Sequence, residues 1–262
     1  MATSQDNKYY PWLPFVTLLR KEILRFWRVS TQTLLTPIVT ASLYLFVFGA
    51  TLGERLNVLP GFSYAQFVIP GLIIMGVINN TFANTSSSLF MSRYLGGIVD
   101  LLVTPVSPPQ FIMAYTLAAM LRGLLVGTVV WLISTIFAEL PWESPLLAIL
   151  MAVIASFLFA QFGLIAAIYA HNFDTLSMYS NFLILPLVYL GGVFYPISIL
   201  PDPWGTFSYL NPLFYLIDGF RHAIIGVGDT SYLVAFGVSL GIATVLFFWA
   251  AWLIGKGYRL RA

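Results

Sequence analysis

Cysteine is absent from this chain of 262 residues, and charged residues are scarce. Without cysteine the protein has no disulfide framework and no thiolate nucleophile. Asp, Glu, Lys and Arg together make up 8% of the residues, about a third of their share in an ordinary soluble domain. So few charges cannot cover the surface of a soluble protein of this length, which excludes a soluble globular domain.

Motifs that bind nucleotides or support hydrolysis are also missing. The sequence has no Gly-x-x-x-x-Gly-Lys-[Ser/Thr] loop for ATP phosphates, no Gly-x-Ser-x-Gly elbow and no His-Glu-x-x-His helix. Its two histidines, His171 and His222, are separated by a long apolar run that is predicted below to cross a membrane, so they cannot share a metal. We therefore expect no catalytic residue, no metal ligand and no cofactor in this chain.

Long apolar runs fill the sequence instead. An α-helix rises 1.5 Å per residue, so about 20 apolar residues cross a hydrocarbon core of about 30 Å. By this criterion the sequence predicts an all-α membrane protein whose residues 1–262 form a single domain. The six predicted spans are residues 31–53, 66–90, 110–137, 145–170, 177–199 and 232–255.

Positive charge is concentrated on one side of these spans. Of the twelve Lys and Arg residues, nine lie on the side of the amino terminus, two lie on the other side and Arg122 lies within a span. Because cytoplasmic loops are enriched in Lys and Arg, both termini are predicted to be cytoplasmic, in agreement with an even number of spans. The basic residues flank a membrane and form no extended groove, which argues against nucleic acid as a partner.

Residues 12–29, ahead of the first span, have the periodicity of an amphipathic helix. We expect this helix to lie in the cytoplasmic interface, with its cations toward lipid head groups or a partner protein. A plain membrane anchor and an anchor that also contacts a partner both remain open. The predicted apolar face is Val16, Leu19, Ile23, Phe26 and Trp27, and the predicted polar face is Thr17, Lys21, Arg25 and Arg28.

The second predicted span carries polar residues at membrane depth. Asn80, Asn84 and Ser87 recur at helical spacing, so one face of this helix is polar. Such side chains need partners or water inside a membrane. They either form hydrogen bonds between helices or line a transport pathway or a seam between subunits.

Arg122 lies near the centre of the third predicted span, beside Gly123 and Gly127. The spacing of the two glycines lets a neighbouring helix approach closely. An arginine at this depth is costly, so Arg122 is expected to face the bundle interior and to find acceptors. Asp100, Asp174, Asn or Gln side chains and backbone carbonyls are all candidate partners, and this choice stays open.

The segment 93–109 is too short and too interrupted to cross a bilayer. Pro105, Pro108 and Pro109 end any helix that begins near Arg93. A short cytoplasmic helix with exposed leucines at 101 and 102 is an interaction site, because exposed apolar patches usually have a partner.

The fifth predicted span and the segment after it are irregular. Pro186, Gly191, Gly192 and Pro196 predict a kinked or broken helix. Residues 200–231 are rich in aromatic residues and proline, and we interpret them as two short helices that dip back into the outer interface.

These segments together resemble the permease subunits of ABC-2 type transporters, especially the bacterial exporters of the polysaccharide, lipo-oligosaccharide and drug-efflux group. The resemblance covers about residues 12–260, and its most specific parts are 93–108, 189–196, 210–215 and 219–221. It implies an interface helix at 12–29, a coupling helix between spans two and three that docks on an ATPase, and external re-entrant helices at 200–231. Members often have Glu where this chain has Asp100, so the acidic charge is kept.

The resemblance also implies partners and site residues. It implies a homodimer in the bacterial inner membrane, paired with two separately encoded ATPase subunits that carry ATP and Mg²⁺. The implied coupling residues are Arg93, Asp100, Leu101, Leu102, Thr104 and Pro105; those of the interface helix are Lys21, Arg25 and Arg28; those of the external helices are Tyr195, Pro196, Asn211, Pro212 and Arg221. Asn80, Asn84, Ser87 and Arg122 are the candidate pathway or seam.

The predicted function is thus that of the permease of an ATP-driven exporter whose substrate is an amphiphile, namely a lipid, a glycolipid or polysaccharide, or a drug. A secondary transporter driven by an ion gradient is the alternative, although such proteins have inverted repeats and ionisable groups at the midplane. An intramembrane enzyme lacks the expected acid–base residues. A structural subunit of a larger complex is a third possibility.

Overall fold

The computed structural model of the protein describes residues 12–51 and 61–259. Every regular element in these residues is a helix, which confirms the predicted all-α class. The α-helices are α1 (Leu13–Trp27), α2 (Ser30–Tyr44), α3 (Tyr64–Tyr94), α4 (Gly97–Val103), α5 (Pro108–Ser134), α6 (Pro145–Tyr169), α7 (Phe173–Met178), α8 (Leu185–Leu190), α9 (Trp204–Tyr209), α10 (Pro212–Ile225) and α11 (Tyr232–Gly255). Two π-helical segments, η1 (Leu45–Thr51) and η2 (Tyr179–Ile184), and one 3₁₀ turn, η3 (Ile197–Ile199), complete the set for the described residues.

Six helical runs are long and apolar enough to cross a membrane, as predicted. They are Ser30–Val47, Tyr64–Tyr94, Pro108–Ser134, Pro145–Tyr169, Phe173–Leu190 and Tyr232–Gly255. The fifth run differs from the predicted 177–199, because its helix ends at Leu190. The turn that follows contains Gly192 with a φ of +80°, a left-handed conformation that glycine adopts without steric cost.

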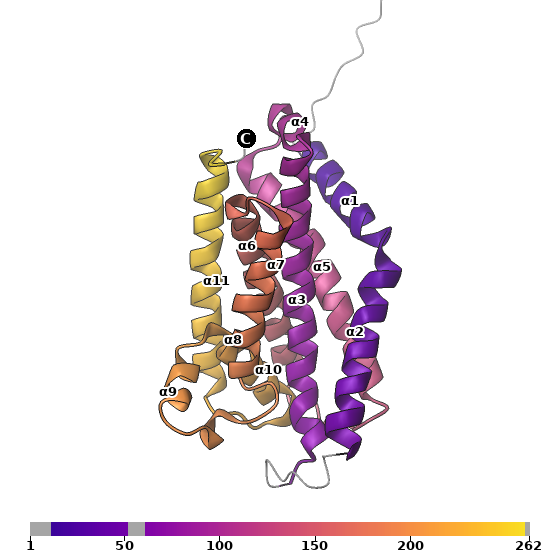
Figure 1. Cartoon of the computed structure of the whole chain (residues 1–262), viewed down its shortest axis with the longest axis vertical. Coiled ribbons are helices and arrows are strands. Elements are labelled where there is room, and N and C mark those ends of the chain that lie inside the picture. Colours follow the sequence, from indigo (N-terminus) through magenta and orange to yellow (C-terminus); the bar gives the residue numbers. More distant parts are fainter. Residues whose placement is uncertain (1–11, 52–60, 260–262) are drawn as a thin grey trace, which may run out of the picture.

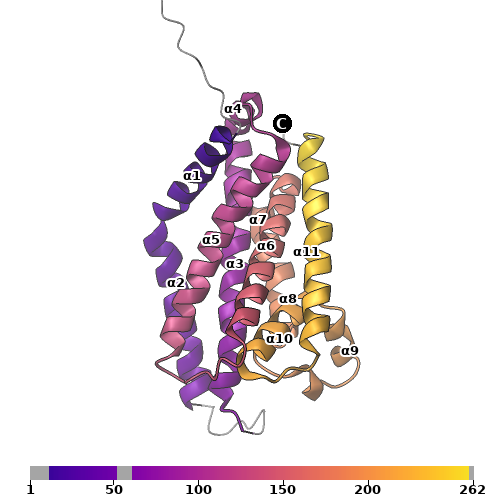
Figure 2. The same cartoon turned by 180° about the vertical axis from the view of Figure 1, so that it is seen from behind.

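The bundle is built around α3 and α6. These two helices pack on each other, while α5 packs on α3 and α11 packs on α6. The helices α1 and α2 run along one edge and α11 runs along the other (Figure 1 and, from behind, Figure 2). In the apolar window of α3, 72% of the residues are buried, compared with 17% in that of the first span and 22% in that of α11. The polar residues of α3 therefore lie inside the protein, whereas most of α2 and α11 is left uncovered.

The two ends of the bundle differ. One end carries α4, the start of α1 and the end of α11, and is called the α4 end here (Figure 1). The opposite end carries α9 and α10, and is called the α10 end (Figure 1).

The first turn of α3 is fixed by a reciprocal cap at the α10 end. The backbone N–H of Gln66 donates to Ser63 Oγ at 3.2 Å, and the backbone N–H of Ser63 donates to Gln66 Oε1 at 2.9 Å. At the α4 end, α5 begins with Pro108 and Pro109, where the missing proline N–H groups cost nothing. The starts of α3 and α5 are therefore both favoured by their local sequences.

Glycine permits the close packing of α3 on its two neighbours. A Cβ atom added at Gly123 of α5 would lie 3.0 Å from the carbonyl oxygen of Val77, and one added at Gly163 of α6 would lie 2.8 Å from that of Phe82. The close approach predicted at Gly123 is thus found. Gly237 and Gly241 of α11 have the same spacing but no helix packed on them, since no described atom lies within 4 Å of a Cβ added at either position.

We expect Gly123→Val to lower the free energy of unfolding by about 1–3 kcal/mol, the usual cost of overpacking. The matched variant Gly237→Val is expected to be neutral or slightly stabilising, because valine is a better helix former than glycine and this position is open. Thermal unfolding of both variants in the same detergent measures the difference. Equal melting temperatures would contradict the packing described for α3 and α5.

The amino-terminal helix α1 leans on the bundle at the α4 end and joins α2 at Arg28 and Val29. It contacts chiefly α5, and its buried residues are Leu18, Glu22 and Phe26. This face is rotated from the predicted apolar face, since Val16 is 41% exposed and Trp27 is 58% exposed.

Residues 200–231 contain two short helices, α9 and α10, as expected. However, α10 lies deeper than an interfacial helix. Its Leu216 and Ile217 are completely buried, and it packs on α3, α6 and α11. It is therefore part of the core at the α10 end.

Candidate functional site

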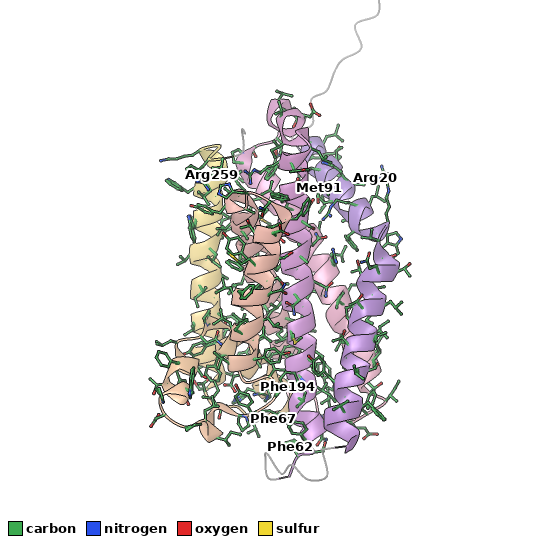
Figure 3. All side chains as sticks on the ribbon, viewed as in Figure 1. Arg20, Phe62, Phe67, Met91, Phe194 and Arg259 are labelled. Atoms are coloured by element: carbon green, nitrogen blue, oxygen red, sulfur yellow. The ribbon has the colours of Figure 1, made fainter. Side chains whose placement is uncertain are left out.

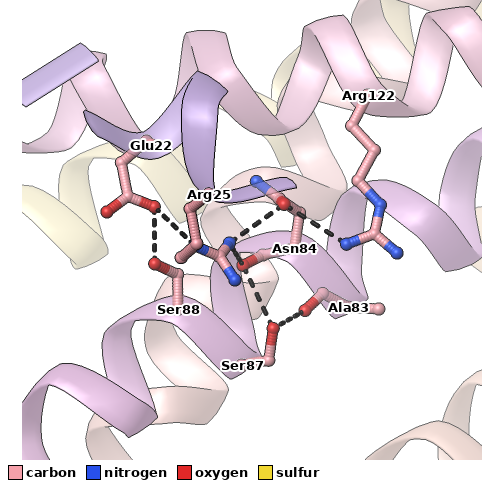
Figure 4. Close-up of polar contacts among 7 residues, drawn as sticks. All are labelled: Glu22, Arg25, Ala83, Asn84, Ser87, Ser88 and Arg122. Carbon is pink, nitrogen blue, oxygen red and sulfur yellow. Dashed lines mark hydrogen bonds and ion pairs between the residues drawn. The ribbon is translucent and has the colours of Figure 1, made fainter. Parts of the chain in front are cut away.

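The polar residues predicted on the second span meet Arg122 inside the bundle. Arg122 of α5 donates to Asn84 Oδ1 at 3.3 Å (Figure 4). It also donates to Asn80 Oδ1 at 3.5 Å. Its partners are therefore side-chain amides of α3, one of the options left open by the sequence. Asp100 and Asp174 are exposed and make no ion pair with it.

A second arginine shares the same acceptor. Arg25 of α1 donates to Asn84 Oδ1 and to the Asn84 carbonyl oxygen, both at 3.0 Å. Arg25 was expected on the outer polar face of the interface helix, but it turns inward (Figure 4). Arg20 lies on the outer side of α1 (Figure 3), and Lys21 and Arg28 are likewise exposed.

Glu22 of α1 completes this cluster and was missed in the sequence. Its carboxylate is 3.2 Å from Arg25 Nε, and it also accepts a short hydrogen bond from Ser88 Oγ. Only 1% of Glu22 is exposed. It lies four residues after Leu18 and four before Phe26, on the buried face of α1, and this spacing was the available signal.

Ser87, in contrast, bonds to its own helix. Its hydroxyl donates to the carbonyl oxygens of Ala83 and Asn84 (Figure 4). Of the three polar residues predicted on this face, only Asn80 and Asn84 reach another helix through their side chains.

A cavity of about 170 Å³ lies between α2 and α3, next to this cluster. Polar groups line part of it, namely Thr36, Thr40, Asn79 and Asn80, and apolar residues such as Leu72 and Met75 line the rest. Tyr44, another lining residue, has its hydroxyl 3.2 Å from that of Tyr189 and its ring centroid 5.4 Å from that of Phe194. This cavity, called the groove below, thus extends from Asn80, which accepts from Arg122, to Tyr44 near the α10 end.

The predicted coupling segment is the helix α4. It follows Gly96, whose φ of +76° turns the chain out of α3. Apolar side chains are exposed here, including Leu95 (72%), Val99 (53%) and Val103 (79%). Of the predicted coupling residues, Asp100, Thr104 and Pro105 are exposed, whereas the side chains of Leu101 and Leu102 lie outside the described residues.

Arg93 points back into the bundle. It donates to the carbonyl oxygens of Ala167 and Ile168 at the end of α6, the latter at 3.1 Å. The last carbonyl groups of a helix have no partner within the helix, and the Arg93 guanidinium supplies one here, as cations near helix ends often do. Arg93 therefore holds α3 against α6, and the exposed surface comes from α4 itself.

At the α10 end, Arg221 ties α10 to two other elements. It is 2% exposed, donates to the carbonyl oxygens of Phe67 and Gly192, and lies 3.9 Å above the Phe67 ring. Burial lowers the pKa of Arg221 to about 10, while the nearby Asp218 and Asp229 oppose this shift, so it stays charged at neutral pH.

The other predicted external residues act in local structure. Asn211 caps α10 by accepting from the Leu213 N–H at 3.0 Å, and Pro212 is the first residue of that helix. Asn211 also donates to the Leu187 carbonyl oxygen at 2.6 Å. Tyr195 is half-buried and Pro196 is buried beside η3, and burial raises the pKa of the Tyr195 hydroxyl.

Asp218 of α10 holds the turn that leads into α11. This fully buried carboxylate accepts from the backbone N–H groups of Asp229 (2.8 Å) and Thr230 (2.9 Å) and from the Thr230 hydroxyl (2.7 Å). Charge-assisted bonds of this kind are about twice as strong as neutral ones.

We expect Asp218→Asn to cost about 2 kcal/mol of stability, because the new amide N–H₂ faces N–H donors and leaves a buried donor unpaired. Asp202→Asn, at an exposed position of the same end, is the matched control. Thermal unfolding of both variants measures the difference. A loss of the same size in the control would contradict the role assigned to Asp218.

Six membrane-length helices that pack around a buried polar cluster define a polytopic membrane protein. The chain belongs to the ABC-2 type transporter family, whose sequence model matches residues 14–225.

Two kinds of relatives agree with this family. The chain is 40% identical to the inner membrane transport permease YadH of Escherichia coli (strain K12) over 252 residues, which cover 96% of this chain and 98% of YadH. It is 24% identical over 215 residues to nodulation protein J of Neorhizobium galegae, covering 82% of each chain. It is also 24% identical over 228 residues to nodulation protein J of Rhizobium meliloti (strain 1021), covering 87% of this chain and 86% of the relative. The protein is thus a multi-pass inner membrane protein and a transport permease of this family.

Proposed function

We propose that this chain is the permease subunit of an ATP-driven exporter and that it forms the translocation pathway as a homodimer. Two separate ATPase subunits, which carry ATP and Mg²⁺, dock on the α4 end. The observation that carries the proposal is the exposed apolar surface of Val99 and Val103 on α4, a helix too short to cross a membrane, together with Leu95 just before it. An exposed apolar patch of this kind marks a protein interface.

The α4 end, with both termini, faces the cytoplasm in this proposal. This end carries the start of α1, which contains the exposed Arg20 and Lys21, and the end of α11, which is followed by the exposed Lys256 and Arg259. Cytoplasmic loops carry an excess of such residues.

The groove between α2 and α3 is the proposed pathway. ATP binding draws the two ATPase subunits together, and the attached α4 helices move the two halves of the dimer. This movement opens the groove toward the α10 end, where Tyr44 lines it and contacts Tyr189 and Phe194.

The second copy is proposed to close this groove. Beside it, Leu35, Val39 and Leu43 form an exposed stripe on α2, with exposed fractions of 55%, 58% and 61%. Positions four residues apart share one face of a helix, so this stripe can meet its equivalent in another copy. The mixed polar and apolar lining suits an amphiphile as substrate.

Purification of the tagged chain from bacterial membranes in a mild detergent tests the proposal. We expect an ATPase subunit to co-purify and to crosslink to residues 95–103. Transport by the purified chain alone in vesicles, driven by an ion gradient without any ATPase, would contradict it and favour a secondary transporter.

A further inference from the structure

The polar cluster of α1, α3 and α5 carries one positive charge in excess. It contains two guanidinium groups, those of Arg25 and Arg122, and one carboxylate, that of Glu22. The carboxylate pairs with Arg25, and Arg122 has no ion pair among the described residues. An unpaired charge near the middle of a span is expensive and marks a functional site by default.

The hydrogen bonding of Arg122 is also incomplete. A guanidinium offers five N–H donors, but Arg122 makes two bonds to protein, at 3.3 and 3.5 Å, at the weak end of the range. Its buried Nε donates to no group among the described residues. In addition, Asn84 Oδ1 accepts from both Arg25 and Arg122. Two like charges thus share one neutral oxygen, an arrangement that an anion would stabilise.

The polar cluster borders the proposed pathway through Asn80. Asn80, which accepts from Arg122, also lines the cavity between α2 and α3. Neither Arg122 nor Asn80 is fully buried, whereas Asn84 is 1% exposed. Arg122 does not line the cavity itself, so an anion in the cavity meets Asn80 first and reaches the Arg122 guanidinium beside that side chain.

We propose that Arg122 and Asn80 bind the anionic head group, a phosphate or a carboxylate, of the amphiphile that the protein transports. This inference rests on the proposed function for the identity of the pathway and adds the charge of its cargo. A guanidinium binds such groups through two parallel N–H donors. The Asn80 amide donates one N–H to the Gly76 carbonyl oxygen at 3.1 Å, and its second N–H supplies the neutral contact to the anion.

Photolabelling of the purified permease in nanodiscs of phosphatidylcholine tests this site. The probes are an alkyl phosphate with a diazirine in its tail and an alkyl trimethylammonium with the same tail. We expect the phosphate to label peptides of α3 and α5 about tenfold more than the ammonium, the factor that one charge-assisted bond provides. Equal labelling by the two probes would overturn the proposal.

Two arginine variants test whether the Arg122 guanidinium is the group that binds the phosphate probe. Arg122→Gln is expected to reduce phosphate labelling about tenfold without a loss of thermal stability, because it removes an unpaired charge. Arg20→Gln, an exposed cation of α1, is the matched control and is expected to change nothing. If Arg122→Gln unfolds the protein or leaves the labelling intact, Arg122 holds the helices together and the proposal is wrong.

Asn84→Asp gives a second, independent test, because it places a carboxylate within reach of both guanidinium groups. We expect a higher melting temperature and the loss of phosphate labelling, since the excess charge is then neutralised inside the protein. Unchanged labelling would overturn the proposal.

Competition separates a transported amphiphile from resident lipid. An excess of phosphatidylglycerol in the nanodisc is expected to leave the labelling intact; full competition would assign the site to bilayer lipid and overturn the assignment to cargo. All these measurements use the permease alone, so a failure to find an ATPase partner would contradict the proposed function without changing them.

Discussion

The double variant Val99→Asp/Val103→Asp is expected to reach the membrane in normal amounts and to lose the proposed ATPase subunit completely. Both valines are exposed on α4, by 53% and 79%. A carboxylate at either position has to be desolvated against an apolar partner surface, which costs several kcal/mol per charge. The desolvation of two carboxylates costs more than the binding free energy that a small docking helix can contribute. The measurement is the ratio of ATPase to permease after affinity purification.

The control carries the same change in charge at the other end of the bundle. Ile199→Asp/Leu210→Asp alters two apolar residues that are 65% and 77% exposed. This variant is expected to keep its ATPase. The docking claim fails if both variants keep the subunit or if both lose it to the same extent.

Glu22→Gln is expected to cost about 3 kcal/mol, the low end of the range for breaking a buried ion pair. The substitution keeps the shape of the side chain but leaves Arg25 and Arg122 beside neutral acceptors only. We expect α1 to separate from the bundle, because Glu22 and Arg25 hold it to α3. Hydrogen exchange of residues 13–27, together with thermal unfolding, measures the effect.

A compensating change identifies the cause. The double variant Glu22→Gln/Asn84→Asp moves the carboxylate to the other side of Arg25, and we expect it to recover most of the lost stability. Arg28→Gln, an exposed cation on the turn after α1, is expected to be neutral. Without recovery in the double variant, charge balance is not the reason that α1 docks.

The sequence predicted the features that depend on one segment alone. The six spans follow from apolar length, and the end of the short α4 follows from the prolines after it. Arg122 was identified because an arginine at membrane depth is costly wherever its partner lies.

Features that depend on two segments could not be predicted. Glu22 and Arg25 appear on an amphipathic helix as ordinary interfacial charges, and only their contacts with Ser88 and Asn84 on α3 give them a buried role. Likewise, the close-packing spacing at Gly123 and at Gly237 is the same in sequence. The two differ because α3 faces the first and no described helix faces the second.

Arg221 shows the same limit at the α10 end. The aromatic and proline-rich composition of 200–231 indicated short interfacial helices. Whether such a helix lies on the bundle or within it depends on its partners, and Arg221 is drawn inward by the carbonyl oxygens of Phe67 and Gly192.

In the proposed function, a separate ATPase binds the α4 end of the permease from the cytoplasm. Because the chain has no cysteine, the variant Val103→Cys carries a single thiol on α4. In intact cells, a membrane-impermeant maleimide is expected to leave this thiol unlabelled. In opened cells it is expected to label the thiol only after the ATPase has been stripped off. Labelling in intact cells would place α4 outside the cell and contradict the account.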